Sequence, residues 1–202
     1  MPEQRSLIVG SLLGDGTMWR GKKGRNANYK IEQGLAQKEY VFWKYEILKP
    51  LVLTEPKLSY RYDVNRQKYP KSWGFRTVRH PLLTEIYDLW YTRNDGHRNG
   101  RKVVPKTIGG DLTPLALAVW IMDDGSYSNG TISISTYSFE LSEINRLQHV
   151  VAQRYGVTFL AHRDRDKGYR MFCNKTQTQI VAKIITPYII PTMLYKIGFK
   201  TP

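Results

Sequence analysis

Two short segments place a carboxylate and a glycine at the end of an apolar stretch. One is Gly14-Asp15-Gly16 and the other is Asp123-Asp124-Gly125. A carboxylate in the last turn of a helix opposes the helix dipole and costs about 0.3–1 kcal/mol. A single Asp-Gly step is a common turn whose carboxylate simply faces water. The matched pair, roughly half of the chain apart, favours a function for Asp15 and Asp124.

A divalent cation would reverse this electrostatic cost. Carboxylates and the unpaired carbonyl groups of a helix end are hard oxygen donors, which magnesium prefers. If the two apolar helices pack side by side, both Asp-Gly ends meet, and Gly10, Gly14 and Ala118 would let the backbones approach. Two carboxylates with metal ions beside a basic surface are suited to phosphodiester hydrolysis.

The composition indicates an anionic partner. The 202 residues include 31 Lys and Arg against 17 Asp and Glu, and the formal net charge is +14. Nucleic acid is the natural partner, because neutralising phosphates releases counterions; a basic protein that is merely soluble is the alternative. The apolar share of 41% is enough for a core, and the single cysteine excludes a disulfide scaffold. No apolar run is long enough to span a membrane.

Periodicity predicts the same order of elements twice. The sequence predicts helices at 3–15, 38–50, 81–90, 115–124, 140–154 and 176–186, and strands at 29–33, 57–63, 72–79, 131–136, 157–163 and 168–173. Thr113 is a candidate N-cap before Pro114. In strand 57–63 we expect Leu58, Tyr60 and Tyr62 to pack on helices. Residues 20–28 and 91–101 are interpreted as loop and linker.

At the two carboxylate segments the sequence resembles the LAGLIDADG homing endonucleases. Residues 8–16 (IVGSLLGDG) and 117–125 (LAVWIMDDG) look like two copies of the nonapeptide that names the family. The resemblance implies an α+β fold of two pseudo-symmetric αββαββα units, 1–104 and 105–202, in one compact body. It also implies a saddle-shaped antiparallel sheet with two central packed motif helices, and a monomer rather than a homodimer of single-motif chains.

The resemblance also implies roles for single residues. Asp15 and Asp124 match the metal-binding acidic residues, whereas Asp123 and Val119 stand where the motif has smaller residues. We expect metal contacts from Asp15 and Asp124, with lesser contributions from Gly14 and Asp123. Further catalytic candidates are Lys102 before Val103-Val104-Pro105, Lys196 in a Tyr-Lys pair and, more weakly, Gln37. The cofactor expected is Mg²⁺, for which Mn²⁺ can substitute.

The polar faces of the strands are the expected DNA-reading surfaces, since two-stranded ribbons fit the major groove. The candidates are Lys30, Lys57, Ser59, Arg61, Arg76, Ser133, Ser135 and Arg170. Each could equally be part of an ordinary solvated strand face. Basic loops at 20–28, 64–71 and 163–167 could grip phosphates.

The function predicted is a site-specific double-strand DNA endonuclease that acts on a long, near-asymmetric site. By resemblance it cuts across the minor groove and leaves 3′ overhangs. An RNA-splicing maturase and a non-cleaving DNA-binding protein of the same fold are the alternatives. We expect an intracellular protein, in the bacterial cytoplasm or an organelle. It lacks the terminal residues of a splicing intein, so an intron-encoded or free-standing enzyme is expected.

Overall fold

The computed structural model describes residues 2–21, 25–92 and 100–199 and groups the chain into two compact units. The smaller unit comprises residues 15–88, and the larger unit comprises residues 1–14 and 89–202. Parts of the expected loop 20–28 and linker 91–101 lie outside the described residues. The division into sequence halves at residue 104 follows the repeat, not these contacts, and stays a prediction.

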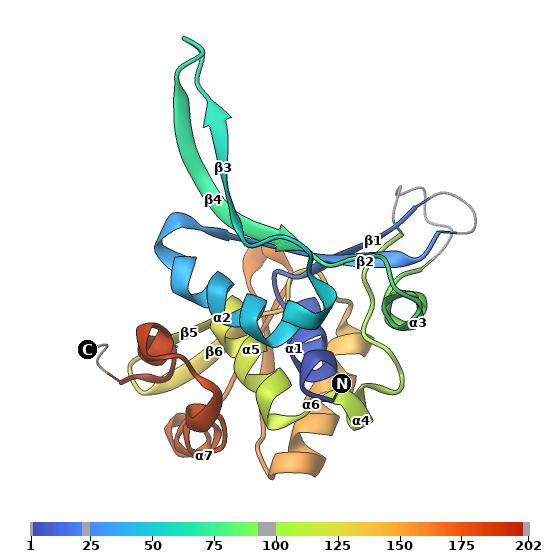
Figure 1. Ribbon diagram of the computed structural model, residues 1–202. Helices are drawn as coiled ribbons and strands as arrows, with labels where there is room; N and C mark the ends of the chain where they lie inside the picture. The colour runs from blue at the N-terminus through green and yellow to red at the C-terminus, as the bar shows by residue number, and fades with distance from the viewer. Residues whose placement is uncertain (1, 22–24, 93–99, 200–202) are drawn as a thin grey trace. The chain divides into compact units, whose positions relative to one another are not determined.

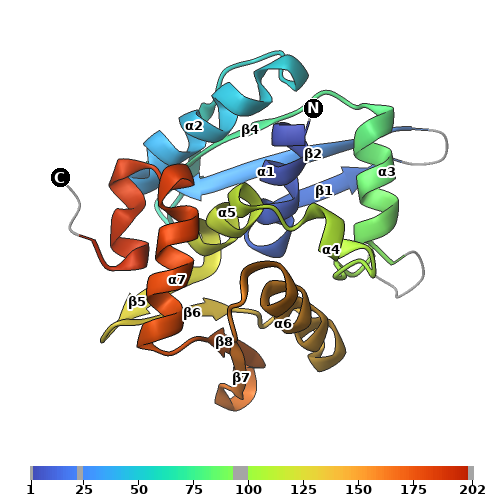
Figure 2. The same ribbon diagram turned by 90° about the horizontal axis from the view of Figure 1, so that it is seen from below.

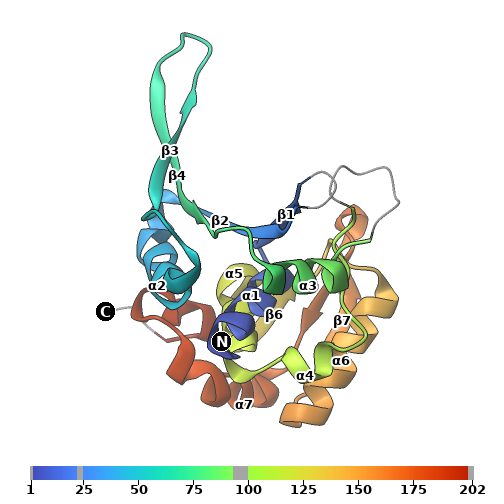
Figure 3. The same cartoon turned by 45° about the vertical axis from the view of Figure 1, so that its right-hand side comes forward.

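The smaller unit is a four-stranded antiparallel sheet with helices. Its strands are β1 (Thr17–Arg20), β2 (Ala27–Gly34), β3 (Lys57–Tyr62) and β4 (Lys68–Arg76), in the order β1-β2-β4-β3. Its helices are α2 (Lys38–Leu48) and most of α3 (Pro81–Trp90), with 3-10 turns at Leu35–Gln37 and Lys49–Leu51. Figure 3 shows α2 and α3 on the same face of this sheet.

In the larger unit, a second four-stranded antiparallel sheet has the order β5-β6-β8-β7. The strands are β5 (Gly125–Ser128), β6 (Thr131–Ser135), β7 (Leu160–Arg163) and β8 (Tyr169–Phe172). The helices are α1 (Pro2–Leu13), α4 (Ile108–Asp111), α5 (Pro114–Asp124), α6 (Leu141–Tyr155) and α7 (Lys175–Ile185), with 3-10 turns at Arg165–Lys167, Thr186–Tyr188 and Pro191–Ile197. Figure 2 shows α1 beside α5, and α6 and α7 beside this sheet.

The element order confirms the predicted repeat. The series α1-β1-β2-α2-β3-β4-α3 is followed, after α4, by α5-β5-β6-α6-β7-β8-α7. Periodicity missed β1 and β5, because each is a four-residue strand that starts within a few residues of the Asp-Gly step. Strand β4 begins at Lys68, so the second half of the expected basic loop 64–71 is strand. No described helix is long and apolar enough to cross a membrane.

Local sequence sets the helix boundaries. The Thr113 hydroxyl accepts a hydrogen bond from the Ala116 amide, and Pro114 opens α5, as predicted. Helix α6 begins with a reciprocal capping box between Glu140 and Glu143. Helix α1 ends at Leu13 rather than at residue 15, so Asp15 lies just beyond the helix.

The prediction for strand 57–63 is wrong in one respect. Tyr60 and Tyr62 were expected to pack on helices, but they are 44% and 66% exposed. A register shift between Ser59 and Tyr60 ends the regular pairing there, and beyond it the β3–β4 hairpin extends past the rest of the smaller unit (Figure 1). Alternation was present in the sequence, but no helix of this unit lies beneath the far end of the hairpin.

Candidate active site and nucleic-acid interface

The ends of the two motif helices lie in the same part of the larger unit. Helices α1 and α5 pack against each other through fully buried residues. Gly14 follows α1 directly, and its amide donates to the Ser11 carbonyl. Asp123 is buried, whereas Asp124, the last residue of α5, is half-buried. The expected side-by-side packing of the motif helices is confirmed.

A lysine ammonium group caps each motif end. The Lys102 Nζ donates to the Gly14 carbonyl at 2.7 Å, and the Lys196 Nζ donates to the Gly125 carbonyl at 2.7 Å. The carbonyl groups at a helix end carry partial negative charge, so each cation is held electrostatically as well as by the hydrogen bond. Both lysines were predicted as site residues. In the structure each contacts the carbonyl group of the residue that is next to Asp15 or Asp124 in the sequence. Their roles stay predictions.

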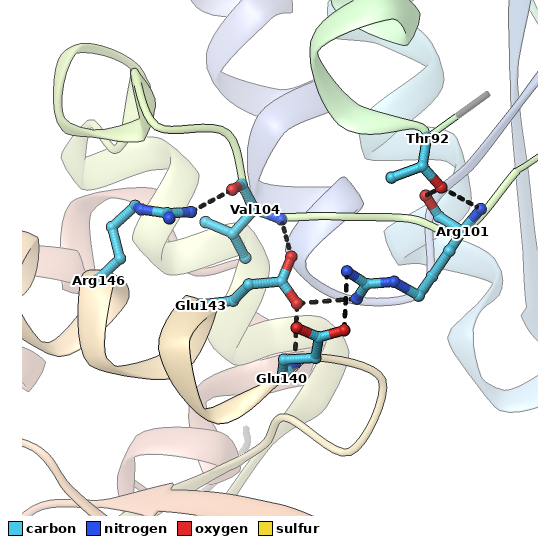
Figure 4. Close-up of polar contacts among 6 residues, drawn as sticks. All are labelled: Thr92, Arg101, Val104, Glu140, Glu143 and Arg146. Carbon is cyan, nitrogen blue, oxygen red and sulfur yellow. Dashed lines mark hydrogen bonds and ion pairs between the residues drawn. The ribbon is translucent and has the colours of Figure 1, made fainter. Parts of the chain in front are cut away.

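The segment that carries Lys102 is fixed by side chains of α6 and of Glu140, the N-cap residue of that helix (Figure 4). The Val104 amide donates to the Glu143 carboxylate at 2.9 Å, and the Val104 carbonyl accepts from Arg146 at 2.6 Å. Arg101 pairs with Glu143 at 2.9 Å and with Glu140 at 3.2 Å. Lys102 lies between these two anchored residues, so the backbone from which its ammonium group reaches Gly14 is held on both sides.

On the N-terminal side of this segment, strand-like bonds add support. The Thr92 amide donates to the Arg101 carbonyl, and the Arg101 amide donates to the Thr92 hydroxyl at 3.1 Å. The Val103 amide donates to the Trp90 carbonyl at 2.8 Å. Sequence reasoning did not identify Glu143, because a glutamate three residues into a helix is typical of a capping box and carries no other signal.

In the smaller unit, Asp15 is exposed and contacts a glutamine. The Gln33 amide donates to the Asp15 carboxylate at 3.0 Å. Gln37, the predicted candidate, instead occupies the N-cap position of α2. Gln33 had a signal in the sequence: it takes the phase of β2 in which Tyr29 and Ile31 are buried, and it is itself only 6% exposed. A polar residue in a buried phase usually has a specific partner.

Four predicted DNA contacts share one face of the smaller sheet. Lys30 lies directly opposite Arg76 in the β2–β4 ladder, and Ser59 lies opposite Ser72. Lys57 lies opposite Gly74. Arg61, the fifth candidate of this unit, is exposed on the hairpin beyond the register shift. The pairing therefore brings Lys30, Lys57, Ser59 and Arg76 together.

The larger sheet has a matching polar face. Ser133 and Ser135 alternate with buried isoleucines along β6, and Ser135 lies opposite Arg170 of β8. The Ser126 and Ser133 hydroxyls are 2.9 Å apart. Thr131, Ser133 and Ser135 therefore form a face of hydroxyl side chains on β6, and Arg170 of β8 lies beside it.

Comparison with known proteins identifies the family of this chain. A model of the LAGLIDADG DNA endonuclease family matches residues 5–181. The chain belongs to this family. It is 33% identical to DNA endonuclease I-ChuI of Chlamydomonas applanata, over 97% of this chain and 94% of that protein. It is 32% identical to cytochrome b mRNA maturase bI2 of Debaryomyces hansenii, over 97% of this chain and 74% of that protein.

A solved structure confirms the predicted α+β fold. The homing endonuclease I-WcaI, bound to its DNA recognition sequence, superposes with a TM-score of 0.84 at 20% identity. The superposition covers 99% of this chain and 88% of that chain.

The two LAGLIDADG motifs pack with complementary departures from the family pattern. Val119 of the second motif stands where the first has Gly10, and the two residues face each other. A Cβ on Gly10 would lie 2.8 Å from the Val119 Cβ and 2.4 Å from the Ala116 carbonyl oxygen. Gly10 thus provides the close approach predicted for it, and its partner is Ala116.

Proposed function

We propose that this chain is a site-specific endonuclease that hydrolyses both strands of a DNA duplex with the help of divalent metal ions, Mg²⁺ in the first place. The observation that supports it is the arrangement at the two motif ends: a carboxylate, Asp15 or Asp124, next to a carbonyl group that holds a lysine ammonium group. Each motif end therefore supplies a metal-binding oxygen and a positive charge for one phosphodiester.

The donor set fits a metal ion of the magnesium type. The described residues contain no cluster of three or more His, Cys, Asp or Glu. Magnesium is held in nucleic-acid enzymes by one or two carboxylates together with waters and substrate phosphates, so Asp15 and Asp124 are sufficient protein ligands. The Gly14 carbonyl already accepts from Lys102, and it retains one lone pair. The bound ion would supply Lewis-acid activation of the phosphate and of water.

The chain's own groups provide the remaining chemistry. Lys102 and Lys196 are fixed donors beside the carboxylates, and they would stabilise the negative charge that develops on the scissile phosphates. Gln33 orients the Asp15 carboxylate through its hydrogen bond. The sheet faces bind the duplex, with Lys30, Lys57, Arg76 and Arg170 as cationic contacts.

The motif duplication supplies both halves of the enzyme in one chain. We therefore expect a monomer on a long, near-asymmetric site, cut across the minor groove to leave 3′ overhangs. Sedimentation of the DNA complex should show one chain per duplex, and the affinity should fall with salt by about 0.9 log units per log salt for each neutralised phosphate. An intracellular location, in the bacterial cytoplasm or an organelle, remains part of this prediction.

The decisive experiment compares Asp15→Asn and Asp124→Asn with wild type. Each variant should lose double-strand cleavage in Mg²⁺ and retain DNA binding, because the amide keeps the shape but lacks the charge that holds the metal. Glu3→Gln, an exposed change in the first turn of α1, is the matched control and should cut normally. Full cleavage by either aspartate variant would refute the metal assignment.

RNA splicing is a second candidate, because a maturase is among the relatives at 32% identity. Splicing of RNA does not include hydrolysis of DNA, so it would not require the metal-binding carboxylates. Splicing of an intron-containing transcript in the presence of the Asp15→Asn variant would separate the two activities. Retained splicing with lost cleavage would assign both functions to the chain.

A further inference from the structure

A carboxylate lies in the middle of the basic face of the smaller sheet. Glu32 of β2 accepts from the Lys30 Nζ at 2.5 Å through Oε2. Its Oε1 accepts from the Ser72 hydroxyl at 2.6 Å and from the Lys71 Nζ at 3.1 Å. These bonds hold the pKa of Glu32 at about 2, and the ammonium group of Lys30 is the main cause. Glu32 is thus ionised at neutral pH.

The hydrogen bonds leave acceptor capacity on this face. A carboxylate oxygen has two lone pairs, so Oε1 is saturated by two donors, whereas Oε2 has room for one more. The Ser59 and Ser72 hydroxyls are 2.5 Å apart. Because the single hydroxyl proton of Ser72 goes to Glu32, the Ser59 hydroxyl donates to Ser72, whose hydroxyl and carbonyl oxygens, the latter at 3.2 Å, both lie within reach. Ser59 can therefore only accept from a ligand.

Beside Glu32 the strand surface is open. Residue 74, opposite Glu32 in the β2–β4 ladder and opposite Lys57 in the β3–β4 ladder, is a glycine. A hollow of about 350 Å³ lies here, and its lining includes the cations Lys30, Lys57 and Arg76, the hydroxyl of Ser59, and a second carboxylate, Glu55, besides Glu32. A Cβ at residue 74 would lie 2.5 Å from the Ile31 carbonyl oxygen, so the packing against β2 requires a glycine, and no side chain covers the face at this position. Cationic donors and the free acceptor of Glu32 thus surround one opening.

This pattern matches one base pair. A G·C pair presents two acceptors on guanine and one amino donor on cytosine in the major groove, and a glutamate accepts from the cytosine amino group. A carboxylate repels the phosphate groups of DNA, so it cannot favour binding to every sequence. A favourable contribution from Glu32 must come from a hydrogen bond to the base that faces it. We propose that Glu32, with Lys30 beside it, is a specificity-determining residue that reads a G·C pair by accepting a hydrogen bond from cytosine. The inference rests on the proposed DNA-binding function.

The test is a binding selection with the full chain on randomised DNA duplexes, in Ca²⁺ so that binding is measured apart from cleavage. Wild type should enrich a G·C pair at one position of the selected DNA. In the Glu32→Gln variant this enrichment should fall by about tenfold or more, and the preference should shift toward adenine, which glutamine prefers. All other positions should keep their preferences. Glu32→Asp retains the charge but shortens the reach, and it should lose the same G·C preference.

Glu46→Gln is the matched control. Glu46 lies on α2, its side chain is 62% exposed, and it also pairs with a lysine, Lys49; this variant should select the wild-type sequence. A structural role for Glu32 would lower affinity for every sequence, whereas loss of a reader leaves affinity for unrelated DNA unchanged or raised. Unaltered preferences at every position, or an equal loss at all of them, would overturn the inference. If wild type enriched no sequence, the proposed function itself would fail.

Discussion

Gly14 and Asp123 occupy equivalent positions of the two motifs and lie directly against each other. A Cβ on Gly14 would lie 2.5 Å from the Cβ of Asp123 and 3.0 Å from its carboxylate. The same relation holds between Gly10 and Val119. Both departures of the second motif therefore occupy space that a glycine of the first motif leaves open. The interface is complementary rather than symmetric, which explains how the second motif tolerates larger residues.

Gly10→Ala should destabilise the larger unit. The added methyl group would meet the Ala116 carbonyl oxygen, a backbone atom that cannot move aside without distorting α5. Overpacking of this kind costs about 1–3 kcal/mol of unfolding free energy, measurable by denaturant titration. Gly110→Ala is the control, because nothing lies within 4 Å of a Cβ there. Equal stability of the two variants would contradict the close packing.

Glu143→Gln should slow cleavage without weakening DNA binding. Glutamine can still accept from the Val104 amide, but the charge pairing with Arg101 is lost, and the segment that carries Lys102 is held less firmly. Glu143 is 5% exposed, so the unfolding free energy should also fall, by about 1–3 kcal/mol. Single-turnover cleavage at saturating enzyme, well below the melting temperature, measures the rate separately from stability.

The matched control changes the other partner of the same arginine. Glu140 has a side chain that is 66% exposed, and an exposed ion pair contributes at most about 1 kcal/mol. Glu140→Gln should therefore keep the wild-type cleavage rate. If both variants slowed cleavage equally, the burial of Glu143 would not be what positions Lys102.

The contribution of Glu32 to the free energy of unfolding should depend on pH and be lost in strong acid. Its folded-state pKa is about 2, below the usual value of 4.5. The ionised group thus favours folding; this stabilisation is complete above about pH 4.5 and is lost as the pH falls toward 2. The difference in unfolding free energy between wild type and Glu32→Gln should be constant at higher pH and shrink across that range. A difference that does not change in acid would contradict the ion-pair network.

Much of the fold could be predicted from the sequence because helix signals are local. Thr113 and Pro114 fix the start of α5, and the two Asp-Gly steps mark the motif ends. Strands β1 and β5 were not predicted, because four residues are too few to show a clear alternation of polar and apolar side chains. The exposure of Tyr60 and Tyr62 could not be inferred, since alternation reveals two faces but not whether a helix covers one of them.

The motif predicts the candidate site residues Asp15, Asp124, Lys102 and Lys196 through the repeat and the family resemblance, and their roles stay predictions. What the structure adds is the contact of each lysine with a carbonyl group next to one of the aspartates. Gln33 and Glu143 were missed, since their partners are reached only through the fold. Glu32 carries no signal in the sequence, because its contacts with Ser72 and Lys71 depend on the pairing of β2 with β4.

Arg61→Ala should relax sequence preference at one or two adjacent base pairs and leave the rest of the site unchanged. Arg61 is exposed on the β3–β4 hairpin, opposite Tyr69, where its guanidinium group can reach a base edge. An arginine bidentate to guanine is worth about 1–3 kcal/mol of discrimination.

Lys68→Ala on the same hairpin is the control. The Lys68 Nζ lies 4.0 Å from the centre of the Tyr60 ring, and a phosphate contact from this lysine would affect all sequences equally. Cleavage of all single-base variants of the site distinguishes the two. If Arg61→Ala lowers every variant by the same factor, Arg61 contacts phosphate, and the hairpin serves affinity rather than base recognition.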